Sequence, residues 1–196
     1  MPDQPAIWSD TPSDISSNID FVLRGPSEIW GADDDTDIEY IYLWTLYHQQ
    51  VAKLTPLQIR EAWIRHIYDE SQPTPYGKDK FGYQNFLWVS NQSAHTLMLE
   101  GHSPPATAHP DNNPHGDMID AQLTTEIFGL LAPGAPHVAL DIAHYPIHTA
   151  GYGEAVRVSE FYVIMHARGA MEPRGPLTPE RLNHIAIGAR PCLPDD

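Results

Sequence analysis

Four carboxylates and a hydroxyl lie within five consecutive residues near the start of the chain, at Asp33, Asp34, Asp35, Thr36 and Asp37. Neighbouring carboxylates raise one another's pKa unless a cation keeps them ionised. Hard divalent cations such as Mg²⁺, Mn²⁺ and Ca²⁺ take oxygen ligands of this kind. The alternative is the first turn of a helix, where Asp and Thr act as caps and the helix dipole favours acidic residues. Because one Asp is enough for a cap, the run favours a metal site.

Two known motif classes fit this run poorly. An EF-hand loop beginning at Asp33 needs Gly at its sixth position and Glu at its twelfth, but these are Ile38 and Trp44. The Asp-Asp-x-x-Asp pattern of terpene synthases is present as Asp33, Asp34 and Asp37. In those enzymes the pattern follows its helix, whereas here the apolar periodicity comes after it. A terpene-type site would therefore require these aspartates at the C-terminal end of a helix.

Composition limits the possible partners and the cellular location. The 196 residues suffice for one domain with a sizeable core. With 11 basic and 26 acidic residues, the net charge of −15 repels nucleic acid and anionic membranes, so we expect neither as a partner. The single Cys192 rules out an internal disulfide and a Cys-based zinc site, and it fits a reducing cytoplasm. Without a visible secretory signal or a long apolar run, we expect a cytoplasmic protein.

Apolar residues at helical spacing predict an all-α fold, with residues 1–28 as a loosely ordered N-terminal segment and residues 29–196 as one helical domain. The capping box at Thr55-Pro56-Leu57-Gln58 gives the firmest helix start. Pro146 is expected to prevent the helix that begins at Pro136 from continuing beyond about Ala143. The predicted helices cover residues 37–51, 55–70, 84–100, 117–131, 136–143, 153–168 and 178–189, with loops at 71–82 and 101–116.

Polar residues inside two of these segments need an interpretation. Asn91 and Gln92 lie among apolar residues, either as buried groups that need partners or as a polar outer stripe. The residues His102, His109 and His115 have spacings that match no usual zinc pattern. In the segment 117–131, one helical face is traced by Met118, Ile119, Leu123, Ile127 and Leu130.

The run Asp33-Asp34-Asp35-Thr36 before a helix resembles the first metal motif of the ADP-ribosylglycohydrolase family. Later segments resemble that family in the same order. They are Asn91 with Ala94, Gly101 and Pro104-Pro105, then His115 to Gln122 with Phe128-Gly129 and Ala132 to Gly134, and finally His148 with Gly151 to Glu154. The resemblance covers residues 30 to 195.

This resemblance implies an all-α orthogonal helical bundle around a pair of Mg²⁺ or Mn²⁺ ions. It implies a hydrolase that cleaves the glycosidic bond of ADP-ribose, in an ADP-ribosylated protein or a related small molecule. The implied metal ligands are Asp33, Asp34, Asp35 and Thr36, of which Asp34 and Asp35 are also the implied catalytic residues. The implied substrate-binding residues are Gly116, Asp117, Asp120, Tyr152 and Gly153. For Asp120, a helix cap or a solvated surface residue is the alternative.

The chain departs from the family pattern in two places. Residues 1–28 lack the Gly-rich segment with an acidic residue that precedes the first metal motif in the family. The late Asp-x-Asp-Thr motif that completes the metal pair occurs here only as Asp33 to Thr36 itself. We therefore expect either a partial-length hydrolase or a non-catalytic helical domain that keeps the fold without a complete metal site.

Overall fold

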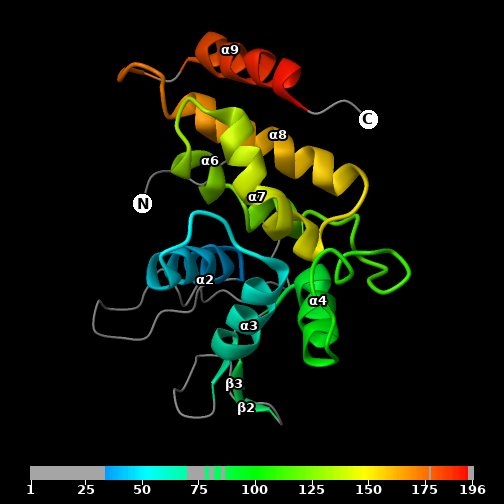
Figure 1. Ribbon diagram of the computed structural model, residues 1–196. Helices are drawn as coiled ribbons and strands as arrows, with labels where there is room; N and C mark the ends of the chain where they lie inside the picture. The colour runs from blue at the N-terminus through cyan, green and yellow to red at the C-terminus, as the bar shows by residue number, and fades with distance from the viewer. Residues whose placement is uncertain (1–33, 70–77, 80–81, 85–86, 177, 194–196) are drawn as a thin grey trace, which may run out of the picture. The chain divides into compact units, whose positions relative to one another are not determined.

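The computed structural model describes residues 34–69, 78–79, 82–84, 87–176 and 178–193 (Figure 1). The chain divides into two compact units, Met1–Gly31 and Ala32–Asp196, and the second contains all the described residues. The predicted N-terminal segment 1–28 and the predicted metal ligand Asp33 lie outside the described residues. Every helix and strand labelled in Figure 1 belongs to the second unit.

The second unit is all-α, as the sequence predicts. A small antiparallel sheet, in the order β1-β3-β2, accompanies the helices where the sequence predicted the end of one helix, a loop and the start of the next helix. The orthogonal arrangement of the bundle stays a prediction. The elements are α2 (Asp34–Gln49), α3 (Pro56–His66), β1 (Tyr68–Asp69), β2 (Lys78–Asp79), β3 (Gly82–Gln84), α4 (Val89–Leu99), α5 (Asp120–Leu123), α6 (Ile127–Leu131), α7 (Pro136–Ala150), α8 (Glu154–Gly169), α9 (Pro179–Ala189) and the 3-10 helix η1 (Arg190–Cys192).

The capping box of α3 is confirmed. The hydroxyl of Thr55 accepts a hydrogen bond from the backbone N–H of Gln58 at 3.3 Å, and Gln58 Oε1 accepts one from the backbone N–H of Thr55 at 2.8 Å. This reciprocal pair satisfies two N–H groups that a helix start leaves without partners. The helix ends at His66, earlier than predicted, because the chain then enters β1 and pairs with β3.

The expectation that Pro146 stops a helix is wrong. Helix α7 continues through Pro146 to Ala150. A proline inside a helix removes one backbone hydrogen bond and disfavours the preceding turn, at a cost of about 3 kcal/mol. Here Pro146 and its neighbours Ala143, Ile147 and Ala150 are buried. Their packing in the core offsets that cost, so tertiary contacts decide the length of this helix.

The single helix expected over residues 117–131 is also wrong, because the chain forms two short helices there, α5 and α6. In the break between them, Thr124 and Thr125 donate their hydroxyls to the carbonyls four residues earlier, a bond that competes with regular helix geometry. The side chain of Glu39 accepts a hydrogen bond from Ile127 N at 2.7 Å and so fixes the start of α6. The face of Met118, Ile119 and Leu130 is exposed rather than buried.

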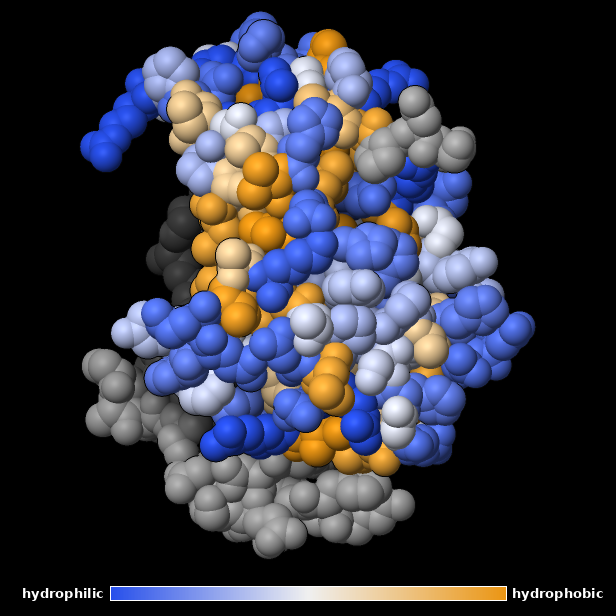
Figure 2. Space-filling model, in the orientation of Figure 1, coloured by the Kyte–Doolittle hydropathy of each residue, from blue (hydrophilic) through white to orange (hydrophobic). Residues whose placement is uncertain are grey.

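The core lies where α2, α3, α6 and α7 meet. Its largest members are Tyr42, Trp63 and Phe128, and the Tyr42 ring centroid lies 5.6 Å from that of Phe128 and 6.4 Å from that of Trp63. Helix α8 packs on α5, α6 and α7, and α9 packs on α8 (Figure 1). Figure 2 shows that apolar side chains also reach the surface of the molecule. Leu131 of α6 and Val138 of α7 are among the apolar residues that line an open pocket. No helix among the described residues is long and apolar enough to cross a membrane.

Candidate functional site

Two carboxylates from distant segments meet at the N-terminal end of α4. Asp34 Oδ2 accepts hydrogen bonds from Trp88 N at 2.7 Å and from Asn91 Nδ2 at 2.8 Å. Asp120 Oδ1 accepts from Ser90 N at 3.1 Å and from Asn91 N at 3.2 Å. The first N–H groups of a helix have no partners within it and attract negative charge. These carboxylates therefore hold the starts of α2, α4 and α5 together, and Asp120 is neither a solvated surface residue nor the cap of its own helix.

Asn91 links the two carboxylates. It is fully buried, which agrees with the interpretation of Asn91 as a buried polar group that needs partners and not with a polar outer stripe. Among the described residues, no hydrogen-bond donor reaches Asn91 Oδ1 or Asp34 Oδ1, although both atoms are buried. Buried polar atoms almost always have partners in folded proteins. Two unsatisfied acceptor oxygens on neighbouring side chains are therefore the pattern that a missing cation or water leaves.

The surroundings of Asp34 disfavour its ionised form in the absence of a cation. Burial raises the pKa of Asp34 above its usual value, and the nearby Asp120 carboxylate raises it further. The hydrogen bonds from Asn91 and Trp88 act in the opposite direction but do not compensate. A cation bound beside Asp34 would stabilise the ionised form and reverse this penalty.

A pocket of about 370 Å³ opens at this junction, and we call it the carboxylate pocket. Asp35, one residue after the buried Asp34, lines it together with Asp120. The remaining lining is apolar: Trp88, Val89, Met118, Ile119 and Leu123. Of these, Trp88 and Ile119 are more than half exposed, so the pocket is open to solvent. The structure thus brings together Asp34, Asp35 and Asp120, which the sequence assigned separately to metal and substrate.

A second pocket, of about 260 Å³, shares Met118 and Ile119 with the carboxylate pocket. Its lining includes Asp117 and Glu154, the first residue of α8. Gly153 directly precedes this helix with φ +58°, a backbone conformation that strains other residues. The predicted substrate residues are therefore divided, with Asp120 in the carboxylate pocket and Asp117 in its neighbour.

Gly116 and Tyr152 join the loop before α5 to the start of α8. Tyr152 N donates a hydrogen bond to Gly116 O at 2.6 Å. A Cβ atom on Gly116 would lie 2.6 Å from Ala108 O and 3.2 Å from Tyr152 Cβ, so only glycine fits. The close approach that the structure shows is thus between two segments of the chain, and a role for Gly116 in substrate binding stays a prediction.

Sequence reasoning missed the residues that support this loop. The buried Asn113 donates hydrogen bonds from Nδ2 to Ser90 O and to Thr107 O, both at 3.1 Å, and accepts one from His115 N. It therefore ties the loop to the start of α4. The sequence contained a signal for Asn91, a polar residue in an apolar helix, but Asn113 lies in a long polar loop with no periodicity to mark it.

The described residues do not form a recognisable metal site. Among them, no three His, Cys, Asp or Glu side chains are grouped so as to hold a metal ion. Thr36, a predicted ligand, is exposed and absent from the described lining of the carboxylate pocket. The unsatisfied Oδ1 of Asp34 and the adjacent Asp35 still suit a hard cation. Because Asp34, Asp35 and Asp37 lie in the first turn of α2, the terpene-type alternative fails.

Comparisons with known proteins identify no relative of this chain. It matches no protein-family model, no curated protein and no solved structure. The resemblance to the ADP-ribosylglycohydrolase family therefore rests on the order of the motifs in the sequence.

Proposed function

We propose that this protein is a metal-dependent hydrolase of the ADP-ribosylglycohydrolase type, acting in the cytoplasm on ADP-ribosylated protein or a related small molecule. The observation that carries the proposal is the buried Oδ1 of Asp34, which has no hydrogen-bond partner among the described residues. The next residue in the chain, Asp35, lines the carboxylate pocket. This supports a cation at the position where the motif resemblance implies one.

In this proposal, Asp34 and Asp35 hold Mg²⁺ or Mn²⁺, together with Asp33 and Thr36 from the same motif. A bound ion of this kind lowers the pKa of a water ligand and stabilises developing negative charge. The fixed orientation of Asp34 comes from Asn91 and Trp88, which engage only Oδ2 and leave Oδ1 for the ion. A ligand carboxylate whose other oxygen is held by hydrogen bonds is a usual arrangement in metal sites.

Asp120 has a different role in the proposal. Its Oδ1 is held by two backbone N–H groups of α4, and its side chain lines the carboxylate pocket. We propose that its second oxygen accepts a hydrogen bond from a hydroxyl of the substrate ribose. Tyr152 and Gly153, with Gly116 and Asp117, belong to the neighbouring loops and bind other parts of the substrate.

The charge of the site makes substrate binding depend on the cation. The described lining of the carboxylate pocket contains two aspartates and no Lys or Arg. The whole chain carries a net charge of −15. A diphosphate would be repelled by this field unless metal ions neutralise it. We therefore expect ADP-ribose to bind only when Mg²⁺ or Mn²⁺ is present.

A second candidate function is a non-catalytic helical domain. The specific observation in its favour is that the described residues hold no group of three metal-binding side chains. On this alternative, Asp34 and Asp120 serve to join α2, α4 and α5 and have no ligand.

A hydrolysis assay separates the two functions. Purified protein is incubated with ADP-ribosylated protein in Mn²⁺ or in EDTA, and released ADP-ribose is measured. We expect release in Mn²⁺ that is lost in EDTA and in Asp35→Asn. The matched control is Asp111→Asn, a substitution at an exposed loop aspartate. Absence of release from the unchanged protein in Mn²⁺ would favour the non-catalytic domain.

A further inference from the structure

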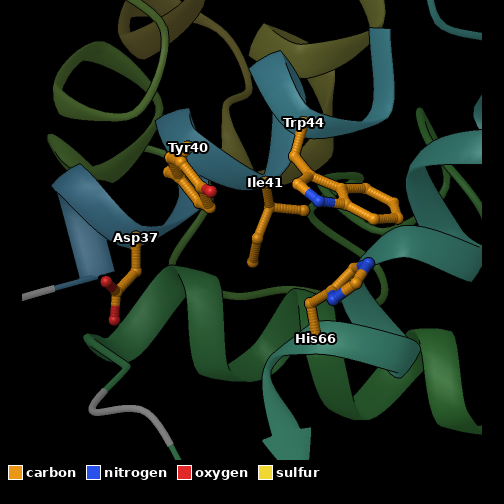
Figure 3. A pocket seen from close by; sticks show the side chains of 5 residues that line it. All are labelled: Asp37, Tyr40, Ile41, Trp44 and His66. Carbon is orange, nitrogen blue, oxygen red and sulfur yellow. The ribbon is translucent and has the colours of Figure 1, made fainter. Parts of the chain in front are cut away.

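A separate pocket of about 200 Å³ runs along α2, beginning one turn beyond Asp34. Asp37, Tyr40, Ile41 and Trp44 line it from α2, and His66 lines it from the end of α3. Figure 3 shows the carboxylate of Asp37 at one end and the rings of Trp44 and His66 at the other. We call this the aromatic pocket.

The two ends of the aromatic pocket differ in chemistry. Ile41, only 5% exposed, projects between them, and Tyr40 is 65% exposed, so the pocket has an apolar base and an accessible aromatic side. The ring of His66 meets that of Trp44 edge-on, with centroids 4.6 Å apart. A pocket lined by a carboxylate and by aromatic rings over an apolar base suits an organic cation, because the ring faces and the carboxylate both attract positive charge.

One cation of the protein already lies within cation–π distance of Trp44. The guanidinium carbon of Arg65 lies 5.9 Å from the centroid of the Trp44 ring. The His48 ring lies 4.1 Å from the same ring, centroid to centroid. Trp44 is thus held in place by neighbours outside the aromatic pocket, which fixes its orientation before any ligand arrives. A ring fixed in this way loses little conformational freedom when it binds.

We propose that the aromatic pocket binds a guanidinium or ammonium group carried on a short apolar stem. The head group contacts the Asp37 carboxylate and the Tyr40 ring, and the stem lies over Ile41 toward Trp44. A volume of about 200 Å³ suits such a group and is too small for a whole dinucleotide. The net charge of −15 attracts cations and repels competing anions. This site does not depend on the hydrolase function and goes beyond it.

An NMR titration tests the proposal with ethylguanidinium as the probe and ethylurea as a neutral molecule of nearly the same shape. The readout is the indole N–H resonance of Trp44, assigned by its loss in Trp44→Phe. We expect saturable shifts at Trp44 with ethylguanidinium, weaker in high salt, and none with ethylurea. Equal shifts with both molecules, or no shift at Trp44, would overturn the proposal.

Substitutions locate the cation within the aromatic pocket. Asp37→Asn should weaken ethylguanidinium binding about two- to fivefold, as for the loss of an exposed ion pair. Tyr40→Ala should weaken it by a similar about two- to fivefold through the lost ring contact. Tyr47→Ala, at an exposed tyrosine of the same helix outside this pocket, is the matched control and should change nothing. Unchanged affinity in Asp37→Asn would contradict the proposed placement and overturn it.

The same titration distinguishes two sources of the cation. N-acetylarginine amide represents a basic side chain of a polypeptide, and putrescine represents a free diamine. Stronger binding of the arginine derivative supports a polypeptide ligand, whereas stronger binding of putrescine supports a free small cation. If adenosine binds and neither N-acetylarginine amide nor putrescine does, the proposal that the pocket binds a cation is overturned.

Discussion

Replacing Asp34 by Asn is expected to stabilise the metal-free protein at neutral pH. Burial is the largest cause of the raised pKa of Asp34, which means that the folded protein disfavours the ionised carboxylate. Each unit of such a shift corresponds to about 1.4 kcal/mol. Asparagine keeps an oxygen that accepts from Trp88 N and Asn91 Nδ2 but has no charge to desolvate. We expect a gain on the order of 1 kcal/mol in the free energy of unfolding, or about 2–4 °C in Tm.

The stability gained by Asp34→Asn should increase with pH. The pKa of Asp34 is higher in the folded protein than its usual value of 3.8, so the folded state binds more protons between the two values. The free energy of unfolding therefore falls as the pH rises through this window. Below pH 3.8 the carboxyl is protonated in both states and the penalty disappears. The difference between Asp34→Asn and the unchanged protein should thus grow as the pH rises above about 4, and it should level off once Asp34 is ionised in both states.

The matched variant Asp34→Leu tests the hydrogen-bond part of this reasoning. Leucine has a similar size but no acceptor, so Trp88 N and Asn91 Nδ2 both lose their partner. Each buried unsatisfied donor costs about 1–3 kcal/mol, and we expect a loss of about 2–5 kcal/mol in total. The measurement is urea denaturation in EDTA, followed by circular dichroism between about pH 4 and about pH 8. Equal destabilisation by Asn and Leu would refute the reasoning.

Four further outcomes are expected in denaturation experiments. Gly129→Ala should cost about 1–3 kcal/mol, because its Cβ would lie 2.3 Å from Val163 O in α8. Gly169→Ala, where the nearest atom lies 4.0 Å from the new Cβ, should instead stabilise α8 by up to about 1 kcal/mol. Thr55→Ala should cost about 1 kcal/mol through the lost cap of α3. Burial raises the pKa of Glu39, so the folded protein disfavours the ionised carboxylate. Glu39→Gln should therefore stabilise the protein at about pH 7 but not at about pH 4, and a larger gain at the lower pH would contradict this.

Local signals in the sequence predicted the helical class and individual helix starts. The capping box at Thr55 depends only on residues three positions apart, so it can be recognised without knowing the fold. The effect of Pro146 could not be predicted in the same way. Whether a helix tolerates an internal proline depends on the packing around it, and here the buried Ile147 and Ala150 keep α7 continuous. The break between α5 and α6 likewise depends on contacts with Glu39 and α8.

The sequence identified several residues of the candidate site but not how they are positioned relative to one another. The acidic run marked Asp34 and Asp35, and the family resemblance added Asp120. No sequence pattern showed that Asp34 and Asp120 bind the same end of α4, because their hydrogen bonds join residues far apart in the chain. The link through Asn91 became visible only in the structure.

Calorimetric titration of Mn²⁺ and then ADP-ribose tests the central claim most directly. The unchanged protein is compared with Asp34→Asn/Asp35→Asn, whose folded state is checked by thermal unfolding in EDTA. We predict that the unchanged protein binds Mn²⁺, binds ADP-ribose only after Mn²⁺, and that the double variant binds neither. Failure of the unchanged protein to bind Mn²⁺, or equal binding by the folded double variant, would contradict a metal site at Asp34 and Asp35.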